Sequence, residues 1–309
     1  MEYEIVVVGS INMDLVVRTN RMPEIGETIP GNDFKTIPGG KGANQAVAAC
    51  RMGATTTMIG CVGQDVFGPS LITSLKDAGV DTNNVTTIAE IASGTATIIV
   101  DSNGENCIVV VPGTNGLVTP KFLQGYENVL KNAKLILTQF EIPLDSVEYL
   151  TSLSKNNNIP IIINPAPAKV VPEGFFSSID YLVVNETEAS FFTEIEVINF
   201  DSGWKAAEKL RKSGAKNVII TMGEKGALLL NEEIRKIFTA QKVDVVDTTA
   251  AGDSFVGGLA AMIVKGNDLI RSMEFAIAAG TLAVTKLGAQ PSIPSRSEVE
   301  VFMSEKDKK

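Results

Sequence analysis

Apolar and polar residues alternate along most of this chain with the rhythm of a layered α/β protein. Residues 5–8 form a continuous apolar run, which is typical of a central parallel strand covered on both faces. From Thr119 onward, short apolar runs alternate with helical patterns, which predicts a mostly parallel central sheet flanked by helices. The predicted strands are residues 55–62, 135–138, 160–164, 181–184 and 217–222, and the predicted helices are residues 67–78, 144–156, 186–193 and 202–213.

A second pattern of β-rich runs is set apart from this sheet. Residues 15–37 alternate polar and apolar positions and contain two prolines and two glycines. Residues 95–100 and 107–111 flank Asn103-Gly104, which is a strong hairpin signal. We expect the segments at about 15–37 and 95–111 to form a small β-sheet that acts as a lid over a ligand.

The C-terminal part of the chain predicts one more hairpin and two closing helices. The hairpin covers residues 228–230 and 234–238, and the helices cover residues 252–264 and 269–287. A loop at 288–292 and a frayed tail at 305–309 follow. Since the sequence has no internal repeat and no linker-like segment, residues 1–309 are expected to form a single domain that carries the lid.

Two glycine-containing stretches are candidates for chemistry, and the first is a turn at residues 38–48, P-G-G-K-G-A-N-Q-A-V-A. It opens a predicted helix that ends near Gly53, and its spacing is not that of a Walker A loop. Glycines such as Gly40 permit close approach of a ligand to the backbone, with Lys41 and Asn44 as hydrogen-bond donors. A simple tight turn explains the glycines equally well.

The second stretch is residues 247–259, D-T-T-A-A-G-D-S-F-V-G-G-L. Ala250, Ala251 and Gly252 leave the first N–H groups of a helix uncovered, and such donors suit an anion such as phosphate. The carboxylate of Asp253 would repel that anion, and an inconsistency of this kind more often marks function than structure. Taken alone, however, the stretch favours a plainer interpretation, in which Asp253 is a helix-terminal charge.

Polar residues follow several predicted strands at the sheet edge where open α/β sheets bind ligands. Asn12 and Asp14 come shortly after the first strand, in a place suited to hydrogen bonds with a polyol. The other positions of this kind are Glu141, Asn164, Asn185 with Glu188, and Thr221 with Gly223. One such residue means little, but the set indicates a site.

The amino-acid composition argues against several classes of partner and catalytic site. The net charge of −9 argues against nucleic acid or an anionic membrane as a partner. The chain has no histidine, which excludes Ser-His-Asp and Cys-His nucleophile systems and HExxH metal sites. Catalysis must therefore rest on carboxylates, lysine or arginine, backbone amides and bound ions. The three scattered cysteines and the lack of a secretion signal or membrane-spanning run predict a cytoplasmic protein.

Taken together, these residues resemble the sugar-kinase family that contains ribokinases, adenosine kinases and fructokinases. Both family signatures are present, at residues 39–48 and 247–259. Further matches in family order, which extend the resemblance over nearly the whole chain, are residues 9–14, 164–168, 185–188, 221–226 and 288–292. The stretches G-G-K-G-A-N-Q-A-V-A and G-A-Q-P-S are closer to the ribokinase branch than to its fructose or adenosine relatives.

The resemblance implies a ribokinase-like fold and ATP-dependent phosphorylation of D-ribose on its 5-hydroxyl. It assigns Asp253 as the general base, which takes the hydroxyl proton. The amides of Ala250, Ala251, Gly252 and Asp253 would stabilise charge on the transferring phosphoryl group. The residues expected to hold the sugar are Asn12, Asp14, Gly40, Lys41, Asn44, Glu141 and Asp253.

The resemblance also implies ATP, Mg²⁺ and a monovalent cation, K⁺, as cofactors. Asn185 and Glu188 match the motif that positions Mg²⁺ and phosphate. The nucleotide-binding residues are expected to be Asn185, Thr221, Gly223, Glu224, Lys225, Gly226 and Gly252. The K⁺ site is expected at Asp247, Thr249, Ser292 and the carbonyls around Ala283, Lys286 and Gly288. Ile277 departs from the family pattern, since relatives often place a more polar residue there beside the adenine.

Alternatives stay open at this point. The sugar-facing residues fit a kinase for 2-deoxyribose or another small sugar as well as one for ribose. A catalytically silent sugar- or nucleotide-binding regulator is disfavoured, because the chain retains Asp253, the Ala-Ala-Gly turn and Glu188 together. An NAD-dependent enzyme is disfavoured because a single glycine, Gly9, follows the first strand. The exposed edges and apolar face of the lid predict a homodimer formed through it.

Overall fold

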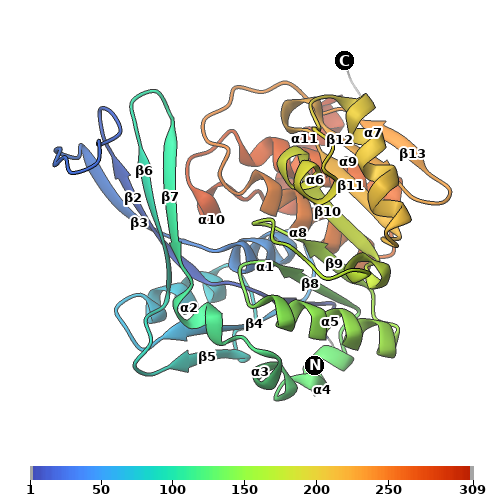
Figure 1. The fold of residues 1–309 in the computed structure, drawn as a ribbon, viewed down its shortest axis with the longest axis horizontal. Coiled ribbons are helices and arrows are strands. Elements are labelled where there is room, and N and C mark those ends of the chain that lie inside the picture. Colours follow the sequence, from blue (N-terminus) through green and yellow to red (C-terminus); the bar gives the residue numbers. More distant parts are fainter. Residues whose placement is uncertain (1–2, 307–309) are drawn as a thin grey trace.

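A computed structural model describes residues 3–306 of the chain, which fold around two β-sheets (Figure 1). The larger sheet has nine strands in the order β13-β12-β11-β10-β9-β8-β1-β4-β5, and the smaller has four in the order β3-β2-β6-β7. The strands of the larger sheet are β1 (Ile5–Val8), β4 (Thr56–Gly63), β5 (Val85–Ile88), β8 (Leu135–Gln139), β9 (Ile161–Asn164), β10 (Tyr181–Asn185), β11 (Asn217–Thr221), β12 (Ala227–Leu230) and β13 (Arg235–Phe238). Those of the smaller sheet are β2 (Asn12–Arg18), β3 (Asp33–Gly39), β6 (Gly94–Val100) and β7 (Asn106–Val111).

Strand β1 lies inside the large sheet, parallel to β4 on one side and β8 on the other. Successive side chains of a strand point to opposite faces, so Ile5 and Val7 enter one hydrophobic cluster and Val6 and Val8 the other. All four residues are fully buried, which explains the continuous apolar run. As predicted, most of the sheet is parallel; β12 and β13 add an antiparallel edge.

Helices cover both faces of the large sheet. Helices α1 (Lys41–Arg51), α8 (Ala251–Val264) and α9 (Leu269–Ala283) pack on one face, and α5 (Leu144–Asn157) and α7 (Phe200–Lys212) pack on the other. The remaining helices are α2 (Gly68–Asp77), α3 (Pro120–Gln124), α4 (Glu127–Lys131), α6 (Glu186–Thr193), α10 (Ala289–Ser292) and α11 (Arg296–Lys306), with 3₁₀ turns η1 (Gly113–Leu117), η2 (Phe175–Ser178) and η3 (Gly223–Lys225). Between residues 3 and 306, no helix has the length and apolar character needed to cross a membrane.

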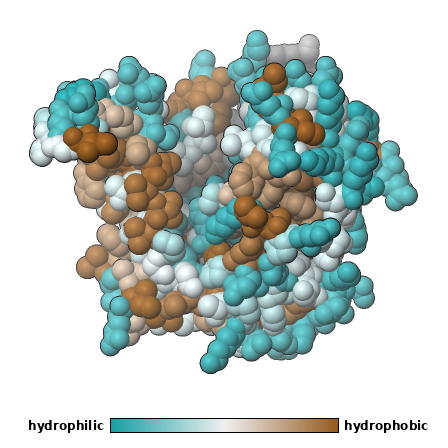
Figure 2. Space-filling view, in the orientation of Figure 1, coloured by the Kyte–Doolittle hydropathy of each residue, from teal (hydrophilic) through white to brown (hydrophobic). Residues whose placement is uncertain are grey.

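The small sheet projects from the main body (Figure 1). Strand β2 pairs antiparallel with β3 and parallel with β6, and β6 and β7 form the predicted hairpin around Asn103-Gly104. Every residue of β7 is exposed, and Figure 2 shows apolar surface over this part of the molecule. The edge strand β7 therefore presents both unpaired backbone groups and apolar side chains, a combination that favours pairing with another chain. The exposed apolar residues are Ile108, Val109, Val110 and Val111, with Phe34 on β3.

Several predicted boundaries were wrong. Strand β2 begins at Asn12, so Asn12 and Asp14 belong to the first lid strand and not to a loop after β1. The helix predicted over 269–287 ends at Ala283, because the amides of Val246 and Asp247 bind the carbonyl of Val284 and draw the following residues into a turn.

The C-terminal end also differs from expectation. Residues 289–292, predicted as a loop, form the short helix α10, and residues 305 and 306, predicted in a frayed tail, belong to α11. The rest of that tail, residues 307–309, lies outside the described residues. Strand β5 and helices α3, α4 and α11 have no counterpart in the prediction, since short or weakly patterned segments carry little periodic signal.

Candidate active site

Predicted site residues from both halves of the chain meet at one edge of the main sheet. A cavity of about 220 Å³ lies beyond the carboxyl ends of β9, β10 and β11, where open α/β sheets bind ligands. It brings together members of the predicted sugar, phosphate and metal groups. The lining residues are Lys41, Asn164, Ala166, Val183, Val184, Asn185, Glu188, Thr221, Thr248, Ala250, Gly252, Asp253 and Val256.

Helix α1 begins against the end of β1 in a space that only glycine fits. Gly40 is the N-cap residue with φ 89°, and a Cβ on it would lie 2.7 Å from the amide nitrogen of Asn12. A Cβ on Gly42 would lie 2.8 Å from the Cα of Gly9. Protein packing therefore accounts for these glycines, as the tight-turn interpretation requires, and close approach of a ligand at Gly40 stays a prediction.

Glu141 gathers the polar groups of the predicted sugar site. Its Oε2 accepts hydrogen bonds from Ser10 Oγ at 2.5 Å, from the Lys41 amide at 3.1 Å and from Asn12 Nδ2 at 3.4 Å. Ser10 Oγ also accepts from the Gly42 amide at 3.2 Å. The structure thus brings Asn12, Lys41 and Glu141 together, although they come from three separate segments.

Asn115 fixes the side chain of Asn12, and no sequence pattern predicted this contact. Asn115 Nδ2 donates to Asn12 Oδ1 at 2.6 Å, and Asn115 Oδ1 accepts from the Ile11 amide at 2.9 Å. Because 103 residues separate the two asparagines, no local pattern links them. Ser10 was missed for a different reason, since a single serine after a strand carries little information.

Four carboxylates act on the ammonium group of Lys41. Burial opposes the charge of Lys41, but the negative charges of Asp253, Glu141, Glu188 and Asp14 together raise its pKa. Burial, followed by the charges of Glu141 and Asp253, raises the pKa of Asp14 to about 7, against the effect of Lys41. Lys41 therefore stays charged at neutral pH, whereas Asp14 titrates there.

Both carboxylate oxygens of Asp253 accept hydrogen bonds from helix α1. Asn44 Nδ2 donates to Oδ2 and Gln45 Nε2 donates to Oδ1, each at 2.9 Å. The two helices approach this closely because α8 presents Gly257, where a Cβ would lie 2.4 Å from that of Ala48. Asp253 does lie in the first turn of α8, as the plainer interpretation states, but it also lines the cavity with two specific donors beside it.

Helix α8 begins with unpaired amides. Its N-cap Ala250 has φ 60°, which is uncommon for alanine. The amide of Ala251 donates to the Thr248 carbonyl at 3.3 Å, whereas those of Gly252 and Asp253 have no acceptor within residues 3–306. A Cβ on Gly252 would meet nothing within 4 Å. This end of the helix therefore leaves two donors and open space for an anion.

Asn185 and Glu188 form a capping box at the start of α6. Asn185 Oδ1 accepts from the Glu188 amide at 2.8 Å, and Glu188 Oε2 accepts from the Asn185 amide at 3.0 Å. Burial raises the pKa of Glu188, although the hydrogen bond from Asn185 and the charge of Lys41 oppose this shift. The pair thus stabilises a helix start, and at the same time it lines the cavity.

The predicted nucleotide loop follows β11 and lies only partly at the cavity. Thr221 lines the cavity, but Gly223, Glu224 and Lys225 are exposed and do not. Lys225 Nζ donates to the Ile198 carbonyl at 3.0 Å, so its ammonium group is engaged elsewhere.

The predicted nucleotide residue Gly226 and the departing position Ile277 also lie outside that cavity. Gly226 has φ 107°, and a Cβ on it would lie 1.9 Å from the Phe238 carbonyl oxygen, so packing explains this glycine. Ile277 lines a separate cavity of about 350 Å³ between β13, α9 and α11. Contact of Gly226 with a nucleotide stays a prediction.

Four members of the predicted cation site lie together. Asp247 Oδ1 accepts from the Thr249 amide at 2.9 Å and the Thr249 hydroxyl at 2.6 Å, and Asp247 Oδ2 accepts from the Gly288 amide at 2.9 Å. Ser292 Oγ lies 3.5 Å from the Thr249 carbonyl oxygen. Burial acts to raise the pKa of Asp247, but the hydrogen bonds from Thr249 and Gly288 hold it below its ordinary value.

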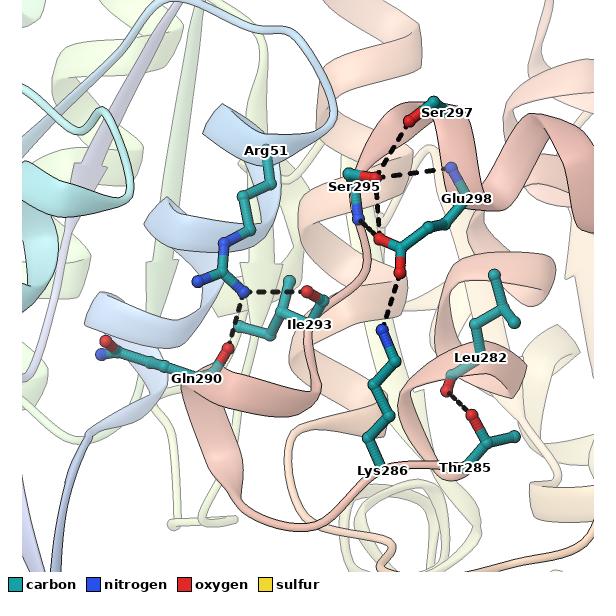
Figure 3. A network of polar contacts seen from close by, with 9 residues as sticks. All are labelled: Arg51, Leu282, Thr285, Lys286, Gln290, Ile293, Ser295, Ser297 and Glu298. Carbon is teal, nitrogen blue, oxygen red and sulfur yellow. Dashed lines mark hydrogen bonds and ion pairs between the residues drawn. The ribbon is translucent and has the colours of Figure 1, made fainter.

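The other two members of that predicted site have contacts of their own. Ala283 is fully buried, and its carbonyl already accepts from the Lys286 amide at 3.3 Å. The ammonium group of Lys286 pairs with Glu298 at 2.7 Å, as Figure 3 shows. Neither contact tests whether the carbonyl oxygens bind a cation.

Arg51, at the end of α1, anchors the same region. Its Nη1 donates to the carbonyl oxygens of Gln290 at 2.7 Å and Ile293 at 2.8 Å, which holds α10 in place (Figure 3). The N-terminal half of α1 carries Asn44 and Gln45. One helix therefore contacts the carboxylate of Asp253 at one end and the segment after Gly288 at the other.

Comparison with known proteins agrees with this arrangement. The chain matches the model of the pfkB family carbohydrate kinases over residues 3–296. It is 36% identical over 303 residues to the ribokinase of Haemophilus influenzae, covering 98% of this chain and 99% of that protein. It is also 36% identical over 302 residues to the deoxyribokinase of Salmonella typhi, with 97% and 99% covered. The structure of Arabidopsis thaliana ribokinase complexed with ribose and ATP matches with a TM-score of 0.92 at 33% identity, over 98% of this chain and 99% of that one. The chain therefore belongs to the pfkB family of carbohydrate kinases.

Proposed function

We propose that this protein transfers the terminal phosphoryl group of ATP to the 5-hydroxyl of D-ribose. The observation that carries the proposal is the position of Asp253, whose carboxylate lies beside the free amides of α8 and within hydrogen-bonding distance of α1. Phosphoryl transfer needs a proton acceptor next to an anion site, and it needs no histidine. A ribokinase relative and a related structure complexed with ribose and ATP support this choice of substrates.

In this proposal Asp253 accepts the proton of the sugar hydroxyl. Each carboxylate oxygen has two acceptor positions, so the bonds from Asn44 and Gln45 leave capacity for the hydroxyl. The amides of Gly252 and Asp253, with those of Ala250 and Ala251 around them, stabilise charge on the transferring phosphoryl group. Positioning and electrostatics then supply the rate enhancement.

The sugar hydroxyls are held by the polar cluster on the lid side of the cavity. Asn12 and the backbone at Gly40 lie beside Glu141, and Asp14 lies on the same lid strand as Asn12. Lys41 supplies a charged donor, and the carboxylates of Asp14 and Glu141 supply acceptors. A closed lid over this cluster would keep water from competing for the phosphoryl group.

The residues present fit the expected cations. When bound, Mg²⁺ neutralises phosphate charge, and Glu188 with Asn185 would hold it, since a buried carboxylate suits a hard cation. Asp247, Thr249 and Ser292 supply only oxygen atoms and one charge, as suits K⁺, with carbonyls near Gly288. In the described part of the chain, no group of three or more His, Cys, Asp or Glu side chains is arranged for a multi-carboxylate metal centre.

The lid also supports a homodimer in this proposal. The exposed apolar edge of β7 suits pairing with a second copy of the chain, and an equilibrium mass measured in solution tests it. The three cysteines are free, which accords with the reducing conditions of a cytoplasmic location.

A second candidate substrate is 2-deoxyribose, because a deoxyribokinase matches the chain with the same identity as a ribokinase. The two sugars differ by one hydroxyl, and a site built to hydrogen-bond that hydroxyl would discriminate strongly against its loss. Comparison of kcat/KM for the two sugars decides between them.

A coupled ADP-release assay across pentoses and hexoses, with Mg²⁺ and with K⁺ or Na⁺, tests the proposal. We expect ADP formation to require a sugar, with the highest kcat/KM for ribose and higher rates in K⁺. If no pentose gives ADP under these conditions, a catalytically silent sugar-binding protein becomes the better account.

A further inference from the structure

A chain of amide side chains lies behind the carboxylate of Asp253. Gln139 Nε2 donates to Gln45 Oε1 at 2.6 Å. Gln45 Nε2 then donates both to Asp253 Oδ1 at 2.9 Å and to Asn164 Oδ1 at 3.1 Å. Both glutamines are fully buried, and Gln139 is the last residue of β8, inside the central sheet. The carboxylate is thereby connected, through buried side chains, to the central sheet.

The direction of these hydrogen bonds is set by the charge at their end. An ionised carboxylate only accepts, so the N–H groups of Gln45 must face Asp253. The oxygen of Gln45 is then turned toward Gln139, which must present its own N–H groups. Only this pair of amide orientations satisfies both contacts.

This arrangement leaves one buried atom without a partner. Gln139 Oε1 accepts no hydrogen bond within residues 3–306, and it is packed so tightly that a Cβ on Gly9 would lie 2.1 Å from it. An unpaired buried oxygen destabilises a fold, and an apolar side chain at this position would avoid that cost. Packing alone therefore does not account for a glutamine at position 139.

We propose that Gln45 and Gln139 are positioning residues for the reaction, which hold the Asp253 carboxylate in one orientation with an acceptor position directed at the sugar hydroxyl. The inference rests on the proposed role of Asp253 as the base. Asn44 holds the other oxygen at 2.9 Å, so rotation of the carboxylate would break hydrogen bonds on both sides. A fixed orientation matters because a small misplacement of a reacting group costs much of the rate.

The first test uses Gln45→Leu, Gln139→Leu and the double variant. We expect kcat to fall about 30-fold for Q45L and about 10-fold for Q139L, with KM for sugar and ATP changed less than about threefold. The double variant should lose little more than Q45L alone, because both act through one contact. The melting temperature of Q139L should stay near that of the parent protein, since the change removes one unpaired oxygen at position 139 and leaves another at Gln45.

The second test is Gln139→Glu, which should give a pH dependence of kcat that a purely structural role would not produce. An ionised Glu at 139 cannot donate, so Gln45 turns its N–H groups toward it and its oxygen toward Asp253. A protonated Glu restores the donor, and burial favours the protonated form. The ratio of Q139E kcat to parent kcat should therefore fall as the pH rises from about 6 to about 8, whereas the ratio for Q139L should stay flat.

Two results separate failure of this inference from failure of the proposed function. Full turnover in Asp253→Asn overturns the role of the base and the inference with it. If D253N is inactive while Q45L, Q139L and Q139E keep the parent kcat at every pH, the positioning role is overturned and the proposed function stands. If a leucine variant fails to fold, two other variants provide the same comparison. They are Gln139→Met, which is closer in shape to glutamine, and Q139E.

Discussion

The proposed active site has a sugar side and a phosphate side, which differ in how far the protein completes its own hydrogen bonds. On the sugar side, Glu141 Oε2 accepts three hydrogen bonds and Asp253 accepts two, all from the protein. On the phosphate side, the amides of Gly252 and Asp253 find no acceptor among residues 3–306, and the loop before α8 exposes Val245 (62%) and Val246 (59%).

This difference shows where each ligand contributes to the order of the site. In this proposal the sugar side is largely organised in advance, although Asn44 Oδ1 is buried without a partner among residues 3–306, so recognition there would depend on fixed geometry. On the proposed phosphate side, the amides of Gly252 and Asp253 have no acceptor among residues 3–306, so a bound anion would complete that half. Changes on the first side should therefore alter catalysis and specificity, and changes on the second should alter the dependence on ligands and ions.

The largest effect is expected at Asp253, which belongs to both sides. Asp253→Asn keeps the shape of the residue but removes the proton acceptor, so kcat should fall by about 10³-fold or more. Binding of sugar and ATP, followed by calorimetry, should change far less. Near-normal turnover in this variant would contradict the assigned role.

The next effect is a pH dependence on the sugar side. The pKa of Asp14 is raised to about 7, so the ionised acceptor is lost as the pH falls through neutrality. The KM for sugar should therefore rise up to about tenfold between pH 8 and pH 6, and Asp14→Asn should give a higher KM without this slope. A flat KM profile in the parent protein would rule out Asp14 as the titrating contact.

The same shift has an opposite consequence for stability. The pKa of Asp14 lies above its ordinary value of 3.8, so the folded state binds more protons than the unfolded state between these values. The contribution of Asp14 to the free energy of unfolding is therefore largest at low pH and is lost as the pH rises through about 7. Denaturant titrations of the parent protein and Asp14→Asn across this range measure the difference.

A smaller effect is expected at the cation segment on the phosphate side. Asp247→Asn removes the charge but keeps a side chain of the same shape beside Thr249 and Gly288. The K⁺ concentration that gives half-maximal activity should rise about fivefold, because the variant loses about 1 kcal/mol of charge interaction with the cation. Equal K⁺ responses in the parent and the variant would place the cation elsewhere.

The smallest effect is expected at Ala250, whose φ of 60° is a left-handed conformation that costs alanine energy. Ala250→Gly relieves this strain but makes the unfolded chain more flexible, so the free energy of unfolding should change by less than about 1 kcal/mol. Turnover should stay within about twofold of the parent if the amide donors keep their directions. A large loss of turnover with unchanged stability would show that the strained turn itself serves catalysis.

Local patterns were sufficient to predict most of the fold. The apolar run of residues 5–8, the alternating strands and helices after Thr119 and the Asn103-Gly104 hairpin were all confirmed, because each depends on neighbours in sequence. The small second sheet was predicted in place, but β2 starts at Asn12, three residues before the predicted segment. The local sequence does not show whether residues 12–14 follow the end of a strand in the main sheet or begin a strand of a second sheet.

The polar contacts that support the site could not be predicted from local sequence patterns. Gln139 contacts Gln45 across 94 residues, and Asn115 contacts Asn12 across 103. Such pairs are created by the stacking of elements, so no motif of fixed spacing contains both members. The residues proposed to contact ligands lie at strand ends and helix starts, which local sequence patterns indicate, whereas no local pattern indicates the residues behind them.

The carboxylates around Lys41 have one more consequence, for departure of the product. Asp14, Glu141, Glu188 and Asp253 outnumber the single ammonium group, so the site has an excess of negative charge. A neutral sugar enters such a field without electrostatic penalty, but a sugar that has gained a phosphate is repelled by it. In the proposed reaction, the carboxylates on the sugar side would therefore favour departure of the phosphorylated sugar, and the free amides of α8 and the bound cations would act against them.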